Sequence, residues 1–189
     1  MTQLVPLNPL IWNIQLPYAS ENNFVNQRVY DIEIALLRKE VLQDLERVQS
    51  FLKSKNFSLK VLDAYRPFSV QEKFWKLCPN EIYLAKPVRD THGKMLKGSK
   101  HSRGAAVDVT LVDQDGKELL MPSGFDEFTE RAHLDYKQGN PLALQNRDFL
   151  VQSMKTFGFI PNLKEWWHFD HHSWKSYEFL DFPLSYFKS

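Results

Sequence analysis

The spacing of apolar and polar positions predicts a chain that mixes helices with strands. In residues 31–54, leucine and valine recur at spacings of four and three, which places them on one face of a helix. Residues 57–63 alternate apolar and polar side chains, as a strand does. Residues 104–112 form an apolar run that predicts a buried strand, and residues 141–157 predict a helix that Gly158 ends. The apolar stripe of the first helix comprises Leu37, Val41, Leu45, Val48 and Leu52.

Shorter segments also carry local signals. Residues 11–18 look extended and end at a turn bounded by proline. Ser69, with Glu72 three residues later, predicts a capping box at the start of a short helix. Residues 79–100 are rich in proline, lysine, glycine and aspartate and predict a long loop, of a kind that often lines a binding site.

The remaining segments complete an α+β pattern. Residues 113–116, DQDG, predict a turn, and residues 117–121 could return from it as the second arm of a hairpin. Residues 159–170 look extended and aromatic. Because helices and strands follow one another without regular βαβ alternation, we predict a small antiparallel sheet backed by helices. A length of 189 residues and the lack of any linker indicate one domain over residues 1–189.

Composition limits the classes of partner and compartment. The chain has 24 basic and 23 acidic residues, so its charge gives no reason to expect nucleic acid or an anionic membrane. A single cysteine, Cys78, cannot form an internal disulfide. The first residues, MTQLVPLNPLIW, do not resemble a secretory signal, and no stretch has the length of a transmembrane helix. We therefore expect a cytoplasmic protein, and a periplasmic one only if a signal peptide was removed; the sequence does not indicate an oligomeric state.

A histidine and an aspartate around a tight glycine–alanine segment form the first candidate for chemistry. His101 ends the long loop, and Asp108 lies within the apolar run GAAVDVTLV. A buried carboxylate is costly unless it is compensated, and a metal ion is one compensating partner. Gly104 gives the chain room to turn between the two residues. Taken separately, His101 would be an exposed loop residue and Asp108 a salt-bridged buried acid.

The sequence Glu165-Trp-Trp-His168 is the second candidate. Residues three apart on a strand point to opposite faces, so these two side chains need a bend to converge. A metal ligand next to a carboxylate that is not a ligand suits metal-assisted hydrolysis, because the carboxylate can take a proton from water and pass it to the leaving amine. Two histidines and one aspartate match a three-ligand zinc site with an open fourth position. Isolated, the pair would be a solvated Glu and His on an exposed strand.

Arg66, in the sequence Asp63-Ala-Tyr-Arg66-Pro, is the third candidate. It follows a predicted strand and precedes a predicted helix, a position from which a side chain can project over a site. An arginine there could stabilise the oxyanion of a tetrahedral intermediate. The alternative is an ordinary salt bridge between Arg66 and Asp63.

These three motifs, in this order, resemble the D-alanyl-D-alanine dipeptidases of the VanX kind. The motifs are Asp-x-Tyr-Arg-Pro, Ser-x-His-x-Arg-Gly-x-Ala-x-Asp and Glu-x-Trp-His, and weaker likenesses extend from about residue 16 to about residue 183. The resemblance implies the fold shared by zinc D,D-peptidases and hedgehog-like signalling domains. It also implies hydrolysis of the small dipeptide D-Ala-D-Ala by a zinc enzyme that binds one zinc ion per chain.

The resemblance assigns a role to each of eight residues. Zinc would be bound by His101, Asp108 and His168, with Glu165 as general base and Arg66 stabilising the oxyanion. The substrate would be bound by Asp126, which would receive its ammonium group, and by Ser99 and Tyr18 in the cavity wall. No role follows for Lys100, directly before the first ligand. We expect His171 and His172 not to join His168, because adjacent side chains on an extended segment diverge.

Two other functions are consistent with the same motifs. One is a D,D-carboxypeptidase or endolysin acting on peptidoglycan, which would need an open groove and often a wall-binding module, for which this chain has no residues left. The other is a zinc-binding module without catalysis. The presence of both Glu165 and Arg66 argues against that module, because neither residue is needed to hold zinc.

Overall fold

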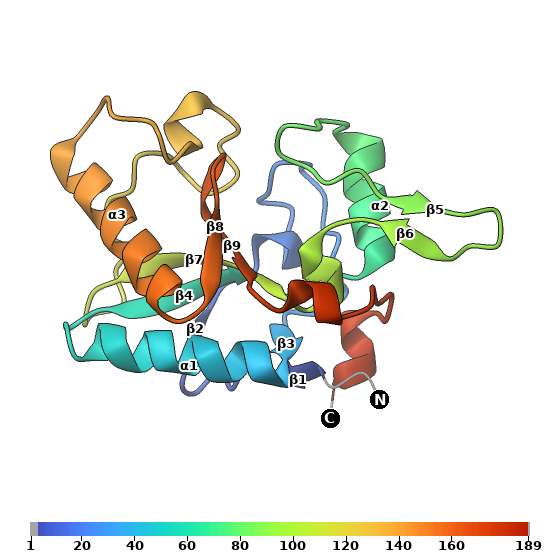
Figure 1. Ribbon diagram of the computed structural model, residues 1–189, viewed down its shortest axis with the longest axis horizontal. Helices are drawn as coiled ribbons and strands as arrows, with labels where there is room; N and C mark the ends of the chain where they lie inside the picture. The colour runs from blue at the N-terminus through green and yellow to red at the C-terminus, as the bar shows by residue number, and fades with distance from the viewer. Residues whose placement is uncertain (1–3, 189) are drawn as a thin grey trace.

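A five-stranded sheet forms the centre of the computed structural model, which describes residues 4–188 (Figure 1). Residues 1–3 and 189 of the predicted domain lie outside the described residues. The strand order is β2-β4-β7-β9-β8. All neighbours are antiparallel except β2 and β4, which are parallel. The predicted α+β class is therefore confirmed, with one parallel pair that the sequence did not indicate. The strands are β2 (Asn13–Ile14), β4 (Ser58–Asp63), β7 (Ala106–Val112), β8 (Phe159–Asn162) and β9 (Glu165–His171).

Within residues 4–188, two small sheets and five short 3-10 helices accompany this central sheet. Strand β1 (Leu4–Pro6) pairs with β3 (Leu36–Arg38), and β5 (Val88–Arg89) pairs with β6 (Met95–Lys97). The 3-10 helices are Pro17–Ala19, Lys100–Arg103, Glu130–Ala132, Trp174–Ser176 and Leu184–Phe187. The β5–β6 hairpin falls inside the predicted long loop, so only part of residues 79–100 is irregular. No helix in residues 4–188 has the length and apolarity needed to cross a membrane.

Helix α1 (Lys39–Lys53) is shorter than predicted at its N-terminal end. The stripe from Val41 to Leu52 is fully buried, as the spacing predicts. Residues 31–38 are not helical, because Leu36–Arg38 pairs with Leu4–Pro6 as a strand and the Arg38 N–H donates to the Gly104 carbonyl. Leu37 is buried all the same, so its apolar character does not distinguish the two conformations.

Helix α2 (Phe68–Leu77) forms, but without the predicted capping box. Its N-cap residue is Pro67, which has no side-chain donor or acceptor. The Ser69 N–H donates instead to Asp181 Oδ1 at 2.7 Å, and Glu72 pairs with Arg89 at 2.7 Å. Partners distant in the sequence have replaced the local cap.

Helix α3 (Pro141–Thr156) matches its prediction at both ends. Asn140 accepts from the Leu142 N–H at the start, and Gly158 has a φ of +88° just past the end. The helix packs on α1 and on β8. The predicted second arm at residues 117–121 is wrong as a strand, because only an isolated bridge joins Val112 to Glu118.

The two faces of β7 separate the core from the site. Val107, Val109 and Leu111 belong to the hydrophobic core, which α1 and α3 help to enclose. Successive side chains of a strand point to opposite faces, so Asp108 points away from that core. Helix α2 and the loops around it lie on the other side of β9 from α3 (Figure 1). The buried acid of the apolar run is thus directed toward the loops.

Candidate active site

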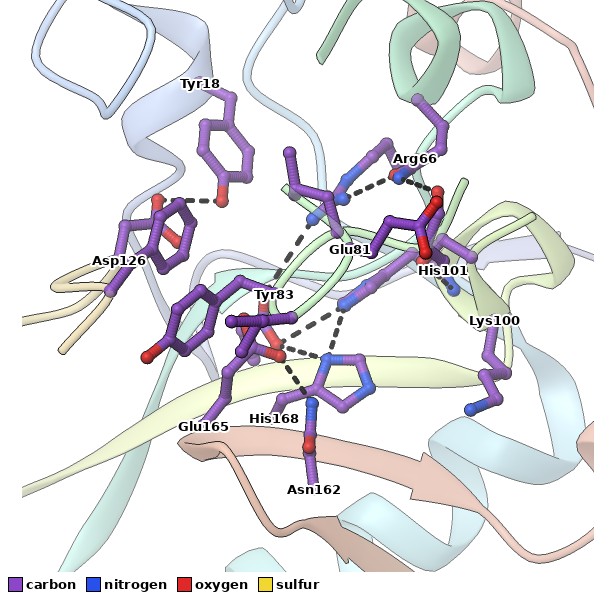
Figure 2. Close-up of a pocket in the computed structure, with 17 residues that line it drawn as sticks. Tyr18, Arg66, Glu81, Tyr83, Lys100, His101, Asp126, Asn162, Glu165 and His168 are labelled. Atoms are coloured by element: carbon purple, nitrogen blue, oxygen red, sulfur yellow. Dashed lines mark hydrogen bonds and ion pairs between the residues drawn. The ribbon is translucent and has the colours of Figure 1, made fainter. Parts of the chain in front are cut away.

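His101, Asp108 and His168 converge in a cavity of about 150 Å³ (Figure 2). Asp108 and His168 lie opposite each other in the β7–β9 register, and His101 comes from the turn before β7. His101 Nε2 lies 3.0 Å from His168 Nδ1 and 3.3 Å from Asp108 Oδ1, and His168 Nδ1 lies 3.0 Å from the same Oδ1. Three potential ligand atoms therefore lie within van der Waals contact of one another.

The outer nitrogen of each histidine is already engaged. His101 Nδ1 lies 2.7 Å from the Ala64 carbonyl, which can only accept, so this nitrogen carries a proton and donates. His168 Nε2 lies 2.9 Å from Asp170 Oδ1, which fixes that ring in the same way. A metal-ligating histidine characteristically donates its other N–H to a carbonyl or a carboxylate. Both inner nitrogens are therefore positioned as ligands.

The cluster attracts positive charge. Burial alone would lower the pKa of His168, but its hydrogen bonds to Asp108 and Asp170 raise that pKa well above its usual range. Burial alone would raise the pKa of Asp108, but His101 and His168 hold it well below its usual range. Tetrahedral zinc with bonds near 2.0–2.1 Å places its donors about 3.3 Å apart. A proton could bridge only two of the three atoms, whereas a metal could bind all three, so the donor set fits zinc.

Backbone geometry at Gly104 brings His101 to this position. Gly104 has a φ of +66°, in the left-handed region, and a Cβ there would collide with the Leu4 side chain. The tight turn places His101 next to the start of β7. Ser99 caps the turn, since its Oγ accepts from the His101 N–H at 3.2 Å, and it lies in the cavity wall.

A bulge in β9 brings Glu165 into the same cavity as His168. Pro161 pairs with Phe169 but Asn162 pairs with Glu165, so β9 advances four residues while β8 advances one. This irregularity supplies the bend that the spacing requires. Glu165 is only 8% exposed and accepts from Asn162 Nδ2 at 2.6 Å. Burial raises the pKa of Glu165 to about 7; His168 opposes this shift and Asp108 adds to it.

Arg66 forms the salt bridge with Asp63 and also lines the cavity. Its Nε and Nη2 both donate to Asp63 Oδ2, at 3.1 and 2.6 Å, and its Nη1 donates to Gln71 Oε1 at 2.7 Å. The Tyr30 hydroxyl donates to Asp63 Oδ1 at 2.6 Å. A guanidinium has five N–H groups, so three contacts fix its plane and leave two for a ligand. The two alternatives for Arg66 are thus compatible.

Asp126 and Tyr18 form another wall of the cavity. The Tyr18 hydroxyl donates to Asp126 Oδ2 at 2.9 Å, and Asp126 has a φ of +57°, an uncommon conformation for a residue other than glycine. Burial and the nearby Asp108 raise the pKa of Asp126 well above its usual range. Negative charges thus crowd this part of the cavity, which favours a cationic ligand group. All eight residues singled out in the sequence line the cavity.

The sequence interpretation missed the residues that support these side chains. Asp170 is the clearest, since one of its oxygens holds His168 and the other lies 3.0 Å from Lys100 Nζ. Its place two residues after His168 on a strand, on the same face, was a usable signal. Asn162 and Gln71 gave no such signal, because their partners depend on the bulge and on the loop before α2.

His171 and His172 lie with Asp44, apart from the cavity, as a second group of potential ligands. His171 Nε2 lies 3.1 Å from Asp44 Oδ2 and its Nδ1 lies 2.7 Å from Ser173 Oγ. His172 Nδ1 lies 3.2 Å from the Gly158 carbonyl. Each ring therefore has protein partners, and the His171–Asp44 contact joins β9 to α1.

Comparisons with known proteins match the chain to a family model, to similar proteins and, more distantly, to a solved structure. Residues 2–184 match the peptidase family described as D-ala-D-ala dipeptidase. A D-alanyl-D-alanine dipeptidase of Escherichia coli (strain K12) is 35% identical over 190 residues, covering 100% of this chain and 94% of that protein. One from Enterococcus faecalis (strain ATCC 700802 / V583) is 33% identical, covering 80% of this chain and 82% of that protein. The solved LdcB LD-carboxypeptidase has a TM-score of 0.47 at 16% identity, covering 92% of this chain and 69% of that chain.

Proposed function

Because the chain belongs to the D-ala-D-ala dipeptidase family of peptidases, we propose that it hydrolyses the dipeptide D-Ala-D-Ala to two molecules of D-alanine. In this proposal residues 1–189 act as one catalytic domain that holds one zinc ion through His101, Asp108 and His168. The observation that carries it is the position of the buried Glu165 beside these three donors, in a small cavity with Asp126 in its wall.

Zinc, Glu165 and Arg66 would each have a distinct role in this reaction. Bound zinc would supply Lewis acidity, which activates water and polarises the peptide carbonyl. Glu165 accepts a proton from the attacking water and later delivers it to the leaving amine nitrogen. Arg66, held flat by Asp63 and Gln71, directs its two remaining N–H groups at the oxygen that becomes negative.

The substrate's own charge explains the selectivity for a dipeptide. Asp126, with Tyr18 donating to it, binds the ammonium group of the first D-alanine, and Ser99 forms part of the wall. An ammonium group bound at a fixed distance from the catalytic groups allows only one residue before the scissile bond. A longer peptide would place a neutral amide against Asp126 instead.

Replacing Arg66 with alanine should lower kcat by roughly 10²–10³-fold with a smaller change in KM, as loss of one oxyanion donor does. The substitution also leaves Asp63 buried without its cation, so folding must be checked by circular dichroism. Arg66→Lys keeps the positive charge but loses the planar guanidinium, so its kcat should lie between those of the wild-type protein and of Arg66→Ala. An unchanged kcat in the folded Arg66→Ala variant would show that Arg66 does not stabilise the oxyanion and serves only in the salt bridge with Asp63.

N-acetyl-D-Ala-D-Ala tests the proposed function directly. It lacks the ammonium group, so its kcat/KM should be at least roughly a hundred-fold below that of the free dipeptide, because Asp126 would be desolvated without a cation. Asp126→Asn should lower kcat/KM for the free dipeptide. It should therefore reduce the difference in kcat/KM between the free and the N-acetylated dipeptide. Equal kcat/KM values for the two substrates would reject the dipeptidase in favour of a D,D-carboxypeptidase with the same metal chemistry.

A further inference from the structure

Lys100 is a cationic residue that lines the cavity, and the proposed reaction assigns it no role. Among the described residues that line the cavity, Arg66 and Lys100 are the two with a permanent positive charge. Arg66 is fixed by Asp63 and Gln71. The Lys100 side chain is 38% exposed, so its ammonium group can reach a ligand that enters from solvent.

The proposed substrate carries a second charge that needs a partner. D-Ala-D-Ala is a zwitterion, and with its ammonium group at Asp126 its carboxylate must lie beyond the scissile bond. Figure 2 shows Asp126 and Lys100 on opposite sides of Glu165 and His168. On the premise of the proposed function, we propose that Lys100 binds the carboxylate of the substrate's second residue and thereby contributes to the choice of a free C-terminus.

The contacts of Lys100 hold it in place without exhausting its donors. Its Nζ lies 3.0 Å from Asp170 Oδ2 and 5.2 Å from the centre of the Trp174 ring. An ammonium group has three N–H donors, so an ion pair with Asp170 leaves two for a carboxylate. Ser99, the preceding residue, accepts from the His101 N–H through Oγ and retains its own hydroxyl proton as a further donor. A cation and a hydroxyl thus adjoin each other in the cavity wall.

The alternative is that Lys100 acts only through the metal ligands. Asp170 contacts both Lys100 and His168, so a lysine that merely balanced the charge of Asp170 would affect every substrate equally. Substrate carboxylate recognition would instead affect only substrates that carry a carboxylate. The two roles therefore differ in a comparison between D-Ala-D-Ala and its neutral amide, D-alanyl-D-alaninamide.

The test measures kcat and KM of the zinc-loaded protein for both substrates. Lys100→Met should raise KM for D-Ala-D-Ala by at least about tenfold, as loss of a charge-assisted hydrogen bond does, with little change for the amide. Lys100→Arg should keep most of the wild-type difference in KM between the dipeptide and the amide. Lys175 is an exposed lysine near the same Trp174 ring, and Lys175→Met should have wild-type kcat and KM. Equal losses for the two substrates, or none for the dipeptide, would overturn the proposal.

Equilibrium binding separates this inference from the proposed function. Calorimetric titration of Glu165→Gln, with and without Lys100→Met, gives Kd values for the same two compounds without turnover. If Lys100→Met weakens binding of the dipeptide but not of the amide, the role of Lys100 is supported. This holds even if the wild-type protein fails to cleave the dipeptide, a result that would reject only the proposed function. A dipeptide that binds equally with and without Lys100, or does not bind, rejects the role of Lys100.

Discussion

Replacing Glu165 with glutamine is expected to lower kcat for D-Ala-D-Ala by about 10²–10⁴-fold, the range for loss of a general base, while one zinc ion per chain stays bound. Glutamine keeps the shape of the side chain and its contact with Asn162 but cannot take a proton. Steady-state kinetics and elemental analysis of the same preparation measure the two properties together. The expected separation of turnover from metal content is specific to a catalytic carboxylate that is not a ligand.

A matched control is available for this substitution. Glu81 is an exposed acid that also lines the cavity, so Glu81→Gln removes one negative charge from the same place. It should change kcat less than tenfold. Loss of zinc together with activity in Glu165→Gln would show that Glu165 is a metal ligand, and equal effects of the two variants would reduce its role to electrostatics.

Removing the metal should abolish activity, and only a protein with all three donors should recover it. Dialysis against a chelator should leave no measurable turnover, and one equivalent of zinc should restore the wild-type rate, because His101, Asp108 and His168 converge without rearrangement. Zinc should also raise Tm, since it binds the folded state. His101→Ala should recover neither rate nor Tm at the same zinc concentration.

The second histidine cluster provides the control for metal binding. His172 lies with Asp44 and His171 and is exposed, so His172→Ala should retain one tightly bound zinc ion and wild-type kinetics. If His172→Ala loses the zinc and His101→Ala keeps it, the metal centre has been assigned to the wrong cluster. Elemental analysis after gel filtration distinguishes these outcomes.

Local patterns in the sequence allowed several elements of the fold to be predicted. The Val41–Leu52 stripe, the apolar run of β7 and the start and end of α3 each depend on local spacing or capping, and the structure has all of them. Leu36–Arg38 could not be predicted, because its conformation depends on pairing with Leu4–Pro6 and on the Gly104 carbonyl. The missing capping box at Ser69 could not be predicted either, because the Ser69 N–H donates to Asp181, which is distant in the sequence.

The candidate site likewise has features that the sequence could predict and features that it could not. The motifs placed His101, Asp108, Glu165 and His168 in one cavity, and the need for a bend between the last two is met by the bulge in β9. Spacing alone could not give the bulge or the contacts that orient each side chain. Those contacts, such as His101 with the Ala64 carbonyl, come from backbone groups whose position is decided by the tertiary structure.

The most direct test of the proposed function is the release of D-alanine from D-Ala-D-Ala by purified protein, before and after removal of zinc. Two molecules of D-alanine per dipeptide are expected from the zinc-loaded protein, none from the chelated protein, and full recovery when zinc is returned. A folded, zinc-loaded protein that releases no D-alanine from the dipeptide would contradict the proposed function. So would a protein that is equally active with and without zinc.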